Sequence, residues 1–101
     1  MTRREKIIDL VRKTAKVYLP EGTVVFIFGS QANQSELRAS DIDIGLKGKE
    51  QLSHELRLDF KEALEGLPTL YTFDVVDFNR AEDGFKGVAL RNVEYIVNDR
   101  E

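Results

Sequence analysis

The sequence predicts a small α/β domain of the α+β kind, in which a short mixed β-sheet is flanked by helices. Three observations lead to this prediction. The chain has 101 residues, which suits one compact domain, so we treat residues 1–101 as a single unit. Apolar residues recur at helical spacing in some segments, whereas in others they alternate or run continuously as they do in strands. Glycine and proline residues separate these segments.

A helix followed by a buried strand is expected at the start of the chain. Thr2 and Glu5 have the spacing of a capping box, and Pro20-Glu21-Gly22 ends the helix. Its apolar residues share one side, and they are Ile7, Ile8, Val11, Ala15 and Tyr18. Thr23–Phe28 is a continuous run of β-branched and aromatic residues, which predicts a strand in the middle of a sheet.

A second strand and a second helix are expected next. The segment Asp41-Ile42-Asp43-Ile44-Gly45-Leu46 alternates strictly, so both aspartates face one side of the strand and the isoleucines face the other. Gly66 and Pro68 end the helix that follows. Its apolar positions are Leu52, Leu56, Phe60, Ala63, Leu64 and Leu67.

The last third of the chain predicts one more strand and one more helix. In a strand from Leu70 to Phe78, Asp74 and Asp77 point to opposite faces, so only one of them can serve a given site. A final helix is expected from about Phe85 to Val97. Its inward residues are Phe85, Val88, Ala89, Val93 and Ile96.

Composition excludes several classes of site. The chain has no cysteine and one histidine, so a metal ion would be held by oxygen ligands. It has no apolar run long enough for a membrane span, and we expect a cytoplasmic protein. The net charge is −3, although the residues up to Leu19 include six basic and two acidic side chains. Direct nucleic-acid binding is therefore not expected, and the basic helix faces solvent, a phosphate or an acidic partner.

Two neighbouring motifs point to phosphate chemistry. Gly29-Ser30 directly follows the buried strand, where glycine lets the backbone approach a phosphate closely. Asp41 and Asp43 supply paired carboxylates on one face, the ligands that Mg²⁺ prefers. Each motif alone is common, but the two together, ten residues apart, favour a magnesium-dependent phosphoryl or nucleotidyl transfer.

This combination resembles the signature of the polymerase-beta-like nucleotidyltransferase superfamily. The resemblance is closest to the minimal nucleotidyltransferases and covers nearly the whole chain. In that family a third metal-binding carboxylate lies in a later strand of the form Asp-hydrophobic-hydrophobic-Asp, which Asp74-Val75-Val76-Asp77 matches. The resemblance therefore implies a nucleotidyltransferase fold in which Asp74 is the third ligand and Asp77 has no part in the site.

The resemblance also implies an activity and a partner. Small members of the family are commonly encoded beside a HEPN-domain protein and act as its antitoxin, in MntA/HepT-like pairs, by transferring AMP from ATP to a tyrosine of that partner. Asp41, Asp43 and Asp74 would be the catalytic residues and would bind Mg²⁺, with two ions expected. Gly29 and Ser30 would bind the nucleotide. A hetero-oligomer with the HEPN-domain toxin, or a homo-oligomer, is compatible with this expectation.

One departure from the family keeps an alternative open. Family members often carry arginine after Gly-Ser and again shortly behind it, whereas here Gln31, Asn33 and Gln34 occupy those places. Arg38 or a partner's residue would then have to neutralise the triphosphate. The alternative is a non-catalytic antitoxin that neutralises a HEPN ribonuclease by binding alone. Transfer to a small molecule is disfavoured, because the chain is too short to build a second domain for that pocket.

Overall fold

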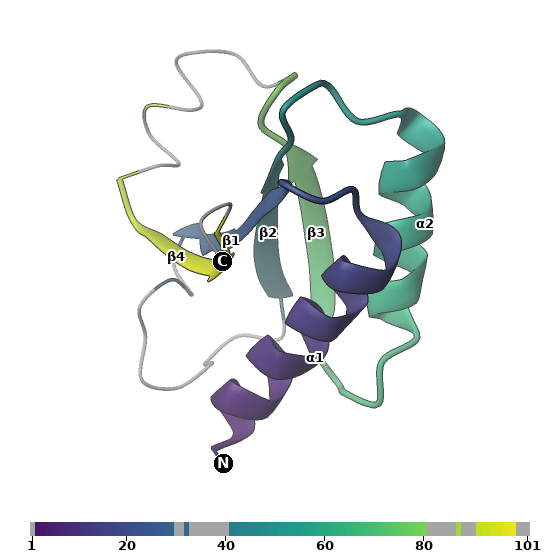
Figure 1. Cartoon of the computed structure of the whole chain (residues 1–101). Coiled ribbons are helices and arrows are strands. Elements are labelled where there is room, and N and C mark those ends of the chain that lie inside the picture. The colour runs from purple at the N-terminus through teal and green to yellow at the C-terminus, as the bar shows by residue number, and fades with distance from the viewer. Residues whose placement is uncertain (1, 30–31, 33–40, 81–86, 88–90, 99–101) are drawn as a thin grey trace.

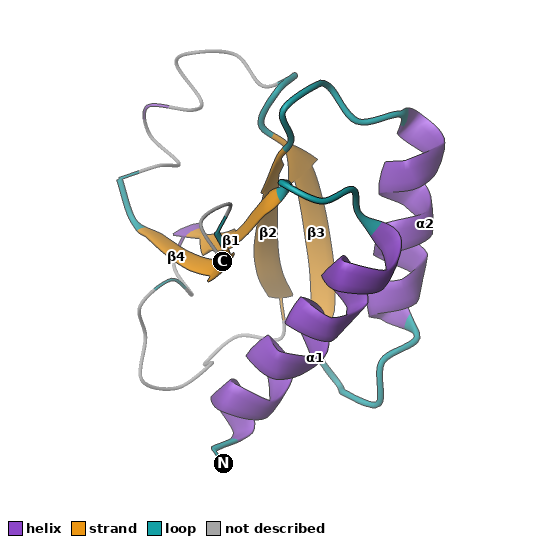
Figure 2. Ribbon diagram, viewed as in Figure 1, coloured by secondary structure: helices purple, strands orange, loops and turns teal. Residues whose placement is uncertain are grey.

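The described part of the chain contains two helices and a four-stranded sheet. The computed structural model describes residues 2–29, 32, 41–80, 87 and 91–98. Their order confirms the predicted α+β class (Figures 1 and 2). The elements are α1 (Arg3–Tyr18), β1 (Val24–Phe28), β2 (Asp41–Lys47), α2 (His54–Glu65), β3 (Thr72–Asp77) and β4 (Val93–Val97). No helix in these described ranges is both long enough and apolar enough to cross a membrane.

The sheet is mixed, with strand order β3-β2-β1-β4. β1 pairs antiparallel with both β2 and β4, as expected for an internal strand, and β2 pairs parallel with β3. The parallel pair is connected through α2, because parallel neighbours require a long crossover. As a result, β1 ends at the same edge of the sheet where β2, β3 and β4 begin.

Both helices cover the same face of the sheet and enclose the main core (Figure 1). The predicted capping box of α1 forms between Thr2 and Glu5, and Ser53 caps α2. Leu64 and Phe60 of α2 have no solvent exposure. The other fully or nearly fully buried residues of this core include Val11, Val25, Ile27, Ile42, Ile44, Leu46 and Ile96.

The opposite face of the sheet carries a small aromatic cluster of Phe26, Phe28 and Phe78. The ring of Phe78 lies edge-on to those of Phe26 and Phe28, with centroid distances of 5.0 Å and 5.1 Å. Gly45 makes room for this packing, because a Cβ atom there would lie 2.2 Å from the ring of Phe26. Aromatic rings therefore fill the part of this face beside the internal strands.

Basic side chains of α1 join the helix to β4. Arg4 forms an ion pair with Glu94, and both side chains are largely buried. Arg12 donates from Nε to the carbonyl oxygen of Ile96 at 3.2 Å. The basic side of α1 is therefore partly used inside the molecule, which corrects the expectation that it faces only solvent or a partner.

The predicted final helix is wrong over Val93–Val97, which forms strand β4. This segment consists mainly of β-branched and aromatic residues, and pairing with β1 supplies a hydrogen-bond ladder along it. The other inward positions of that predicted helix, Phe85, Val88 and Ala89, lie outside the described residues. A second correction concerns Tyr18, which is 42% exposed although its spacing placed it in the core.

Candidate active site

Three aspartates occupy one face of the parallel strand pair. Asp41 and Asp43 lie on the face of β2 away from the helices, because the alternate residues Ile42 and Ile44 are buried in the helix-covered core. In the register of β2 and β3, Asp43 is the partner of Asp74. The predicted catalytic residues therefore lie on one face of the sheet, at the end where both strands begin. We call Asp41, Asp43 and Asp74 the aspartate trio.

Asp43 lies in the middle of the aspartate trio and in the least polar surroundings. Across β2 it pairs with Phe28 on one side and with Asp74 on the other. Burial raises the pKa of Asp43, and the negative charges of Asp74 and Asp41 raise it further. Among the described residues, no lysine or arginine forms an ion pair with Asp43 or Asp74. The site therefore accumulates negative charge that a cation would offset.

Asp41 has a partner that the sequence analysis missed. The hydroxyl of Thr72 donates to Oδ1 of Asp41, and the two residues are register partners at the start of β3 and β2. Thr72 stands two positions before Asp74 and so lies on the same face of β3. Strand alternation predicts the face of Thr72, but only the parallel pairing of β2 with β3 places it beside Asp41.

The predicted phosphate-binding glycine lies beside this trio. Gly29 has a φ of +78°, and a Cβ atom there would lie 3.0 Å from Oδ2 of Asp43. The amide of Ala32 donates to the carbonyl of Gly29 at 3.3 Å, and this hydrogen-bonded pair defines the Gly29 turn. The other predicted nucleotide-binding residue, Ser30, lies outside the described residues.

Asn92 is a second polar residue that the sequence analysis missed. Its Nδ2 atom lies 3.3 Å from the carbonyl oxygen of Gly29 and 3.5 Å from that of Ala32. A single asparagine in a segment predicted as helical has no local pattern that would single it out. Its place beside the Gly29 turn follows from the pairing of β4 with β1.

The aspartate trio has the chemistry of a magnesium site. Within the described ranges, no three or more His, Cys, Asp or Glu side chains are gathered closely enough to hold a metal ion as they stand. The donor set nevertheless fits Mg²⁺, because it consists of carboxylate oxygens on one face whose mutual repulsion a divalent cation would relieve. Asp41, Asp43 and Asp74 are thus the residues that would hold such an ion.

Asp77 is separated from the trio by the alternation of β3, as predicted. It is 5% exposed, whereas Asp74 faces solvent on the other side. Its Oδ1 accepts from the amide of Asn79 at 2.9 Å, and its Oδ2 lies 3.5 Å from Nε of Arg80. Arg80 in turn donates to the carbonyl of Leu52 at 2.7 Å. Asp77 therefore fastens the chain after β3 to the segment before α2.

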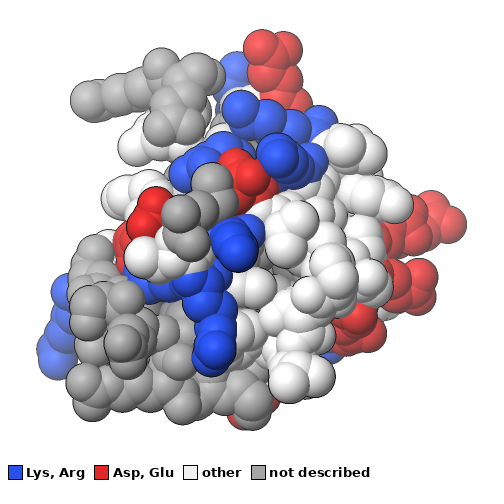
Figure 3. Space-filling model, turned by 90° about the horizontal axis from the view of Figure 1, so that it is seen from below, with Lys and Arg blue, Asp and Glu red and all other residues white. Residues whose placement is uncertain are grey.

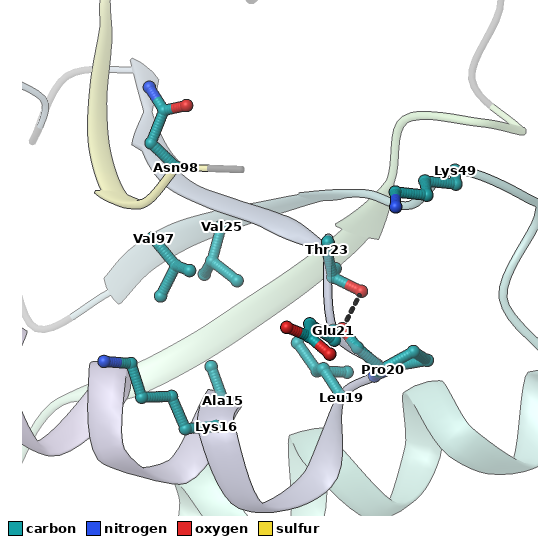
Figure 4. Close-up of a pocket in the computed structure, with 11 residues that line it drawn as sticks. Ala15, Lys16, Leu19, Pro20, Glu21, Thr23, Val25, Lys49, Val97 and Asn98 are labelled. Carbon is teal, nitrogen blue, oxygen red and sulfur yellow. Dashed lines mark hydrogen bonds between the residues drawn. The ribbon is translucent and has the colours of Figure 1, made fainter. Parts of the chain in front are cut away.

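A hollow lies at the other end of the strands (Figure 4). It has a volume of about 740 Å³ and lies between the end of α1, the start of β1 and the end of β4. Lys16, Lys49 and Glu21 contribute its charged groups. No member of the aspartate trio lines it, and neither does Gly29, so this hollow is separate from the candidate active site.

The charge on the surface is mixed at the end of the molecule where α1 begins. Figure 3 looks at this end from below and shows basic side chains interspersed with acidic ones. The strands that carry the aspartate trio begin at the same end (Figure 1). Exposed basic side chains in the first turns of α1 are Arg3 and Lys6. A polyanion approaching this end would therefore meet positive as well as negative charge.

Comparison with protein families gives a match over almost the whole chain. The family model described as "Polymerase beta, Nucleotidyltransferase" matches residues 5–101. No curated protein matches the chain at a significant level.

Solved structures match the fold at low sequence identity. One is a chain of the complex between the tri-AMPylated HEPN toxin and the MNT antitoxin of Shewanella oneidensis, with a TM-score of 0.76, 18% identity, and coverage of 96% of this chain and 74% of that one. A toxin–antitoxin structure with AMP-PNP matches with a TM-score of 0.74 and 20% identity, and the match covers 90% of this chain and 73% of that one. The MntA–HepT toxin–antitoxin structure matches with a TM-score of 0.72 and 16% identity, and the match covers 95% of this chain and 74% of that one.

Proposed function

The chain belongs to the polymerase beta nucleotidyltransferase family, and from this premise we propose that it is a magnesium-dependent protein adenylyltransferase. Its substrate would be ATP, and its acceptor a tyrosine hydroxyl on a HEPN-domain toxin, for which it would be the antitoxin. Structures of similar fold include an MNT antitoxin in complex with an AMPylated HEPN toxin and a toxin–antitoxin pair with AMP-PNP. These likenesses support the proposed nucleotide and partner.

The observation that carries the proposal is the register of β2 and β3. It sets Asp74 directly beside Asp43, on the face where Gly29 approaches Oδ2 of Asp43. Carboxylates and a close backbone approach at one sheet edge are what a metal-bound triphosphate requires. The same register keeps Asp77 on the far face.

The proposed reaction is an in-line displacement at the α-phosphorus of ATP. The acceptor oxygen forms a bond to the α-phosphorus, the bond to the β-phosphate oxygen breaks, and pyrophosphate leaves. Bound Mg²⁺ supplies charge neutralisation for the triphosphate and the leaving group. Asp41 and Asp43 would hold the metal ion and orient the triphosphate. Asp74 lies nearest the acceptor and takes the proton of its hydroxyl. Gly29 lets the backbone lie against the β and γ phosphates.

A second candidate is an antitoxin that acts by binding alone. Two observations favour it: Gln31, Asn33 and Gln34 stand where the family often has arginines, and the described side chains are not gathered into a metal site as they stand. The raised pKa of Asp43 favours catalysis instead, because a protein that only binds has no use for three repelling carboxylates. We therefore rank transfer first.

Co-expression with the HEPN-domain protein of the neighbouring gene tests the proposal. Intact-mass analysis of the purified partner should show one or more added AMP groups with the wild-type chain and none with Asp41→Asn/Asp43→Asn. Lys49→Gln, in the hollow at the other end of the strands, is the matched control and should leave the modification unchanged. A partner that is neutralised equally by wild type and the double variant, and stays unmodified, would establish the binding antitoxin instead.

A further inference from the structure

We infer that Asn92 is a positioning residue that holds the Gly29 turn in shape for the β and γ phosphates of the nucleotide. The inference rests on the proposed function, because it concerns how that same site receives a triphosphate. Asn92 has no part in the roles proposed for the aspartates. The side-chain amide of Asn92 reaches the backbone at both ends of the turn.

The placement of Asn92 follows from the sheet. Phe28, the last residue of β1, pairs with Val93, the first residue of β4. Because the two strands are antiparallel, the residue that follows Phe28 lies opposite the residue that precedes Val93. These two residues are Gly29 and Asn92. The ladder between β1 and β4 therefore brings the asparagine to the turn.

The contacts account for why this position carries an asparagine. Nδ2 has two N–H donors, and it lies 3.3 Å from the Gly29 carbonyl and 3.5 Å from the Ala32 carbonyl. Ala32 also donates its own amide to the Gly29 carbonyl, and its side chain has no solvent exposure. One side chain thus ties down two carbonyl oxygens of a turn that is already anchored in the core.

The consequence for a triphosphate is electrostatic. A carbonyl oxygen carries partial negative charge, so a carbonyl held by fewer hydrogen bonds would repel phosphate oxygens more strongly and would be freer to rotate toward them. Bonded to Asn92, the carbonyls of Gly29 and Ala32 are held on the β4 side of the turn and their charge is partly offset. A Cβ atom on Gly29 would lie 3.0 Å from Oδ2 of Asp43, so the constraint acts at the edge of the aspartate trio.

Nucleotide binding separates this role from a merely structural one. The affinities of the full chain for ATP and for AMP in Mg²⁺ are measured by titration calorimetry for wild type, Asn92→Ala and Asn92→Asp. Loss of the hydrogen bonds should weaken ATP binding roughly 10-fold in Asn92→Ala, and more in Asn92→Asp, whose charge repels both carbonyls and phosphates. AMP lacks the β and γ phosphates, so its affinity should change by less than about 2-fold.

Asn79→Ala is the matched control. Asn79 also ties two chain segments together through its side-chain amide, with bonds of 3.1 Å to the amide and carbonyl of Gly48, but it lies away from the Gly29 turn. It should leave the affinities for ATP and AMP unchanged. Thermal unfolding of every variant shows whether the fold is intact.

Several outcomes would overturn the inference. Equal loss of ATP and AMP in the Asn92 variants, or no loss of either, would show that the turn does not depend on Asn92 for phosphate binding. Unfolding of both Asn92 variants while Asn79→Ala stays folded would make Asn92 a structural residue only. A wild-type chain that binds no ATP would overturn the proposed function and this inference with it, whereas intact wild-type binding with unaffected Asn92 variants overturns the inference alone.

Discussion

At the scale of single residues, Asp43 is a carboxyl whose ionisation destabilises the fold. Burial raises its pKa, and the charges of Asp74 and Asp41 add to the rise. A carboxyl whose pKa is higher in the folded than in the unfolded chain destabilises the fold when it is ionised. This destabilisation is complete above the folded pKa, shrinks as the pH falls through it, and disappears below the unfolded pKa.

We therefore expect Asp43→Asn to stabilise the metal-free protein at pH 7. The gain in free energy of unfolding should be at most about 1 kcal/mol, because Asp43 is partly solvated and solvent screens its repulsion. Urea unfolding in EDTA across a pH series measures it. The gain should fall toward zero as the pH approaches the ordinary aspartate pKa of about 3.9. A gain that grows on acidification would contradict the assignment.

Gly29 has a positive φ, a backbone conformation that favours glycine. Alanine at a φ of +78° is expected to cost about 1–2 kcal/mol of stability, and its Cβ would press on Oδ2 of Asp43. Gly29→Ala should therefore lower both the melting temperature and ATP affinity. Gly66→Ala is the control, because Gly66 caps α2 with a φ of −82° and a Cβ there meets nothing closer than 3.5 Å. Equal effects of the two substitutions would mean that the turn is not strained.

At the scale of elements, β3 separates a candidate catalytic carboxylate from a structural one. Asp74 is exposed on the face of the trio, and Asp77 is buried on the helix-covered face with Asn79 and Arg80. This separation of roles is set by strand alternation and therefore depends on the register of β3.

Asp74→Asn should accordingly lose activity, whereas Asp77→Asn should lose stability. Asp74→Asn should reduce AMP transfer by at least about 100-fold while leaving the melting temperature close to wild type. Asp77→Asn should keep most of the activity but lose about 1–3 kcal/mol of stability, because it removes the charge of a buried carboxylate that accepts from the amide of Asn79 and pairs with the partly exposed Arg80. Initial transfer rates and urea unfolding, measured on the same preparations, distinguish the two. A similar loss of activity in both variants would show that the assumed register is wrong.

The contact between α1 and β4 makes a second prediction at this scale. Glu94→Gln should destabilise the protein by about 1–3 kcal/mol, because it leaves the guanidinium of Arg4 buried without its counter-charge, and burial already lowers the pKa of Arg4. Lys13→Gln removes only the pair between the exposed Lys13 and Asp9, and it should change stability by less than about 0.5 kcal/mol. Urea unfolding measures the free energy of unfolding of both variants. Equal losses would show that the buried pair contributes no more to stability than the exposed one.

At the scale of the whole molecule, the sheet has one face for stability and another for chemistry. The helices enclose the main core on one face. The aspartate trio and the Phe26–Phe28–Phe78 cluster share the opposite face. A ligand on the second face therefore stabilises the folded state without having to displace a helix.

Mg²⁺ and ATP together should raise the melting temperature of the wild-type chain. At a nucleotide concentration of about 100 times Kd the gain is about 2.7 kcal/mol, since the ligand binds only the folded state. EDTA should abolish the gain, and so should Asp41→Asn/Asp43→Asn. Lys49→Gln should keep it, because Lys49 lies at the hollow on the other end of the strands. A double variant that retains the full gain would contradict the metal assignment.

Most of the fold could be predicted because each element has a local signal. The capping box marks α1, the unbroken apolar run marks β1, and strict alternation marks β2 and the two faces of β3. β4 was mistaken for a helix because Val93 and Ile96 fit helical spacing as well as they fit a strand. Its pairing with β1 decides the outcome, and that pairing is remote in sequence.

The same distinction applies to the candidate site. Gly29 and the aspartate trio belong to short sequence motifs, so they could be proposed as site residues from the sequence. Thr72 and Asn92 contribute through strand order and register, which no local pattern contains.

The pairing of β1 with β4 also has a consequence for the timing of synthesis. β1 can begin to pair with β2 as soon as residue 47 is available, whereas its other edge stays open until residues 93–97 have been made. Closing so long a loop is slow relative to local contacts, and an open strand edge invites pairing with other chains. Asn92 reaches Gly29 only at that late step. A ribosome-bound chain would therefore contain its aspartate trio well before Asn92 can reach the carbonyl of Gly29, so the contacts of the Gly29 turn would form only when β4 pairs with β1.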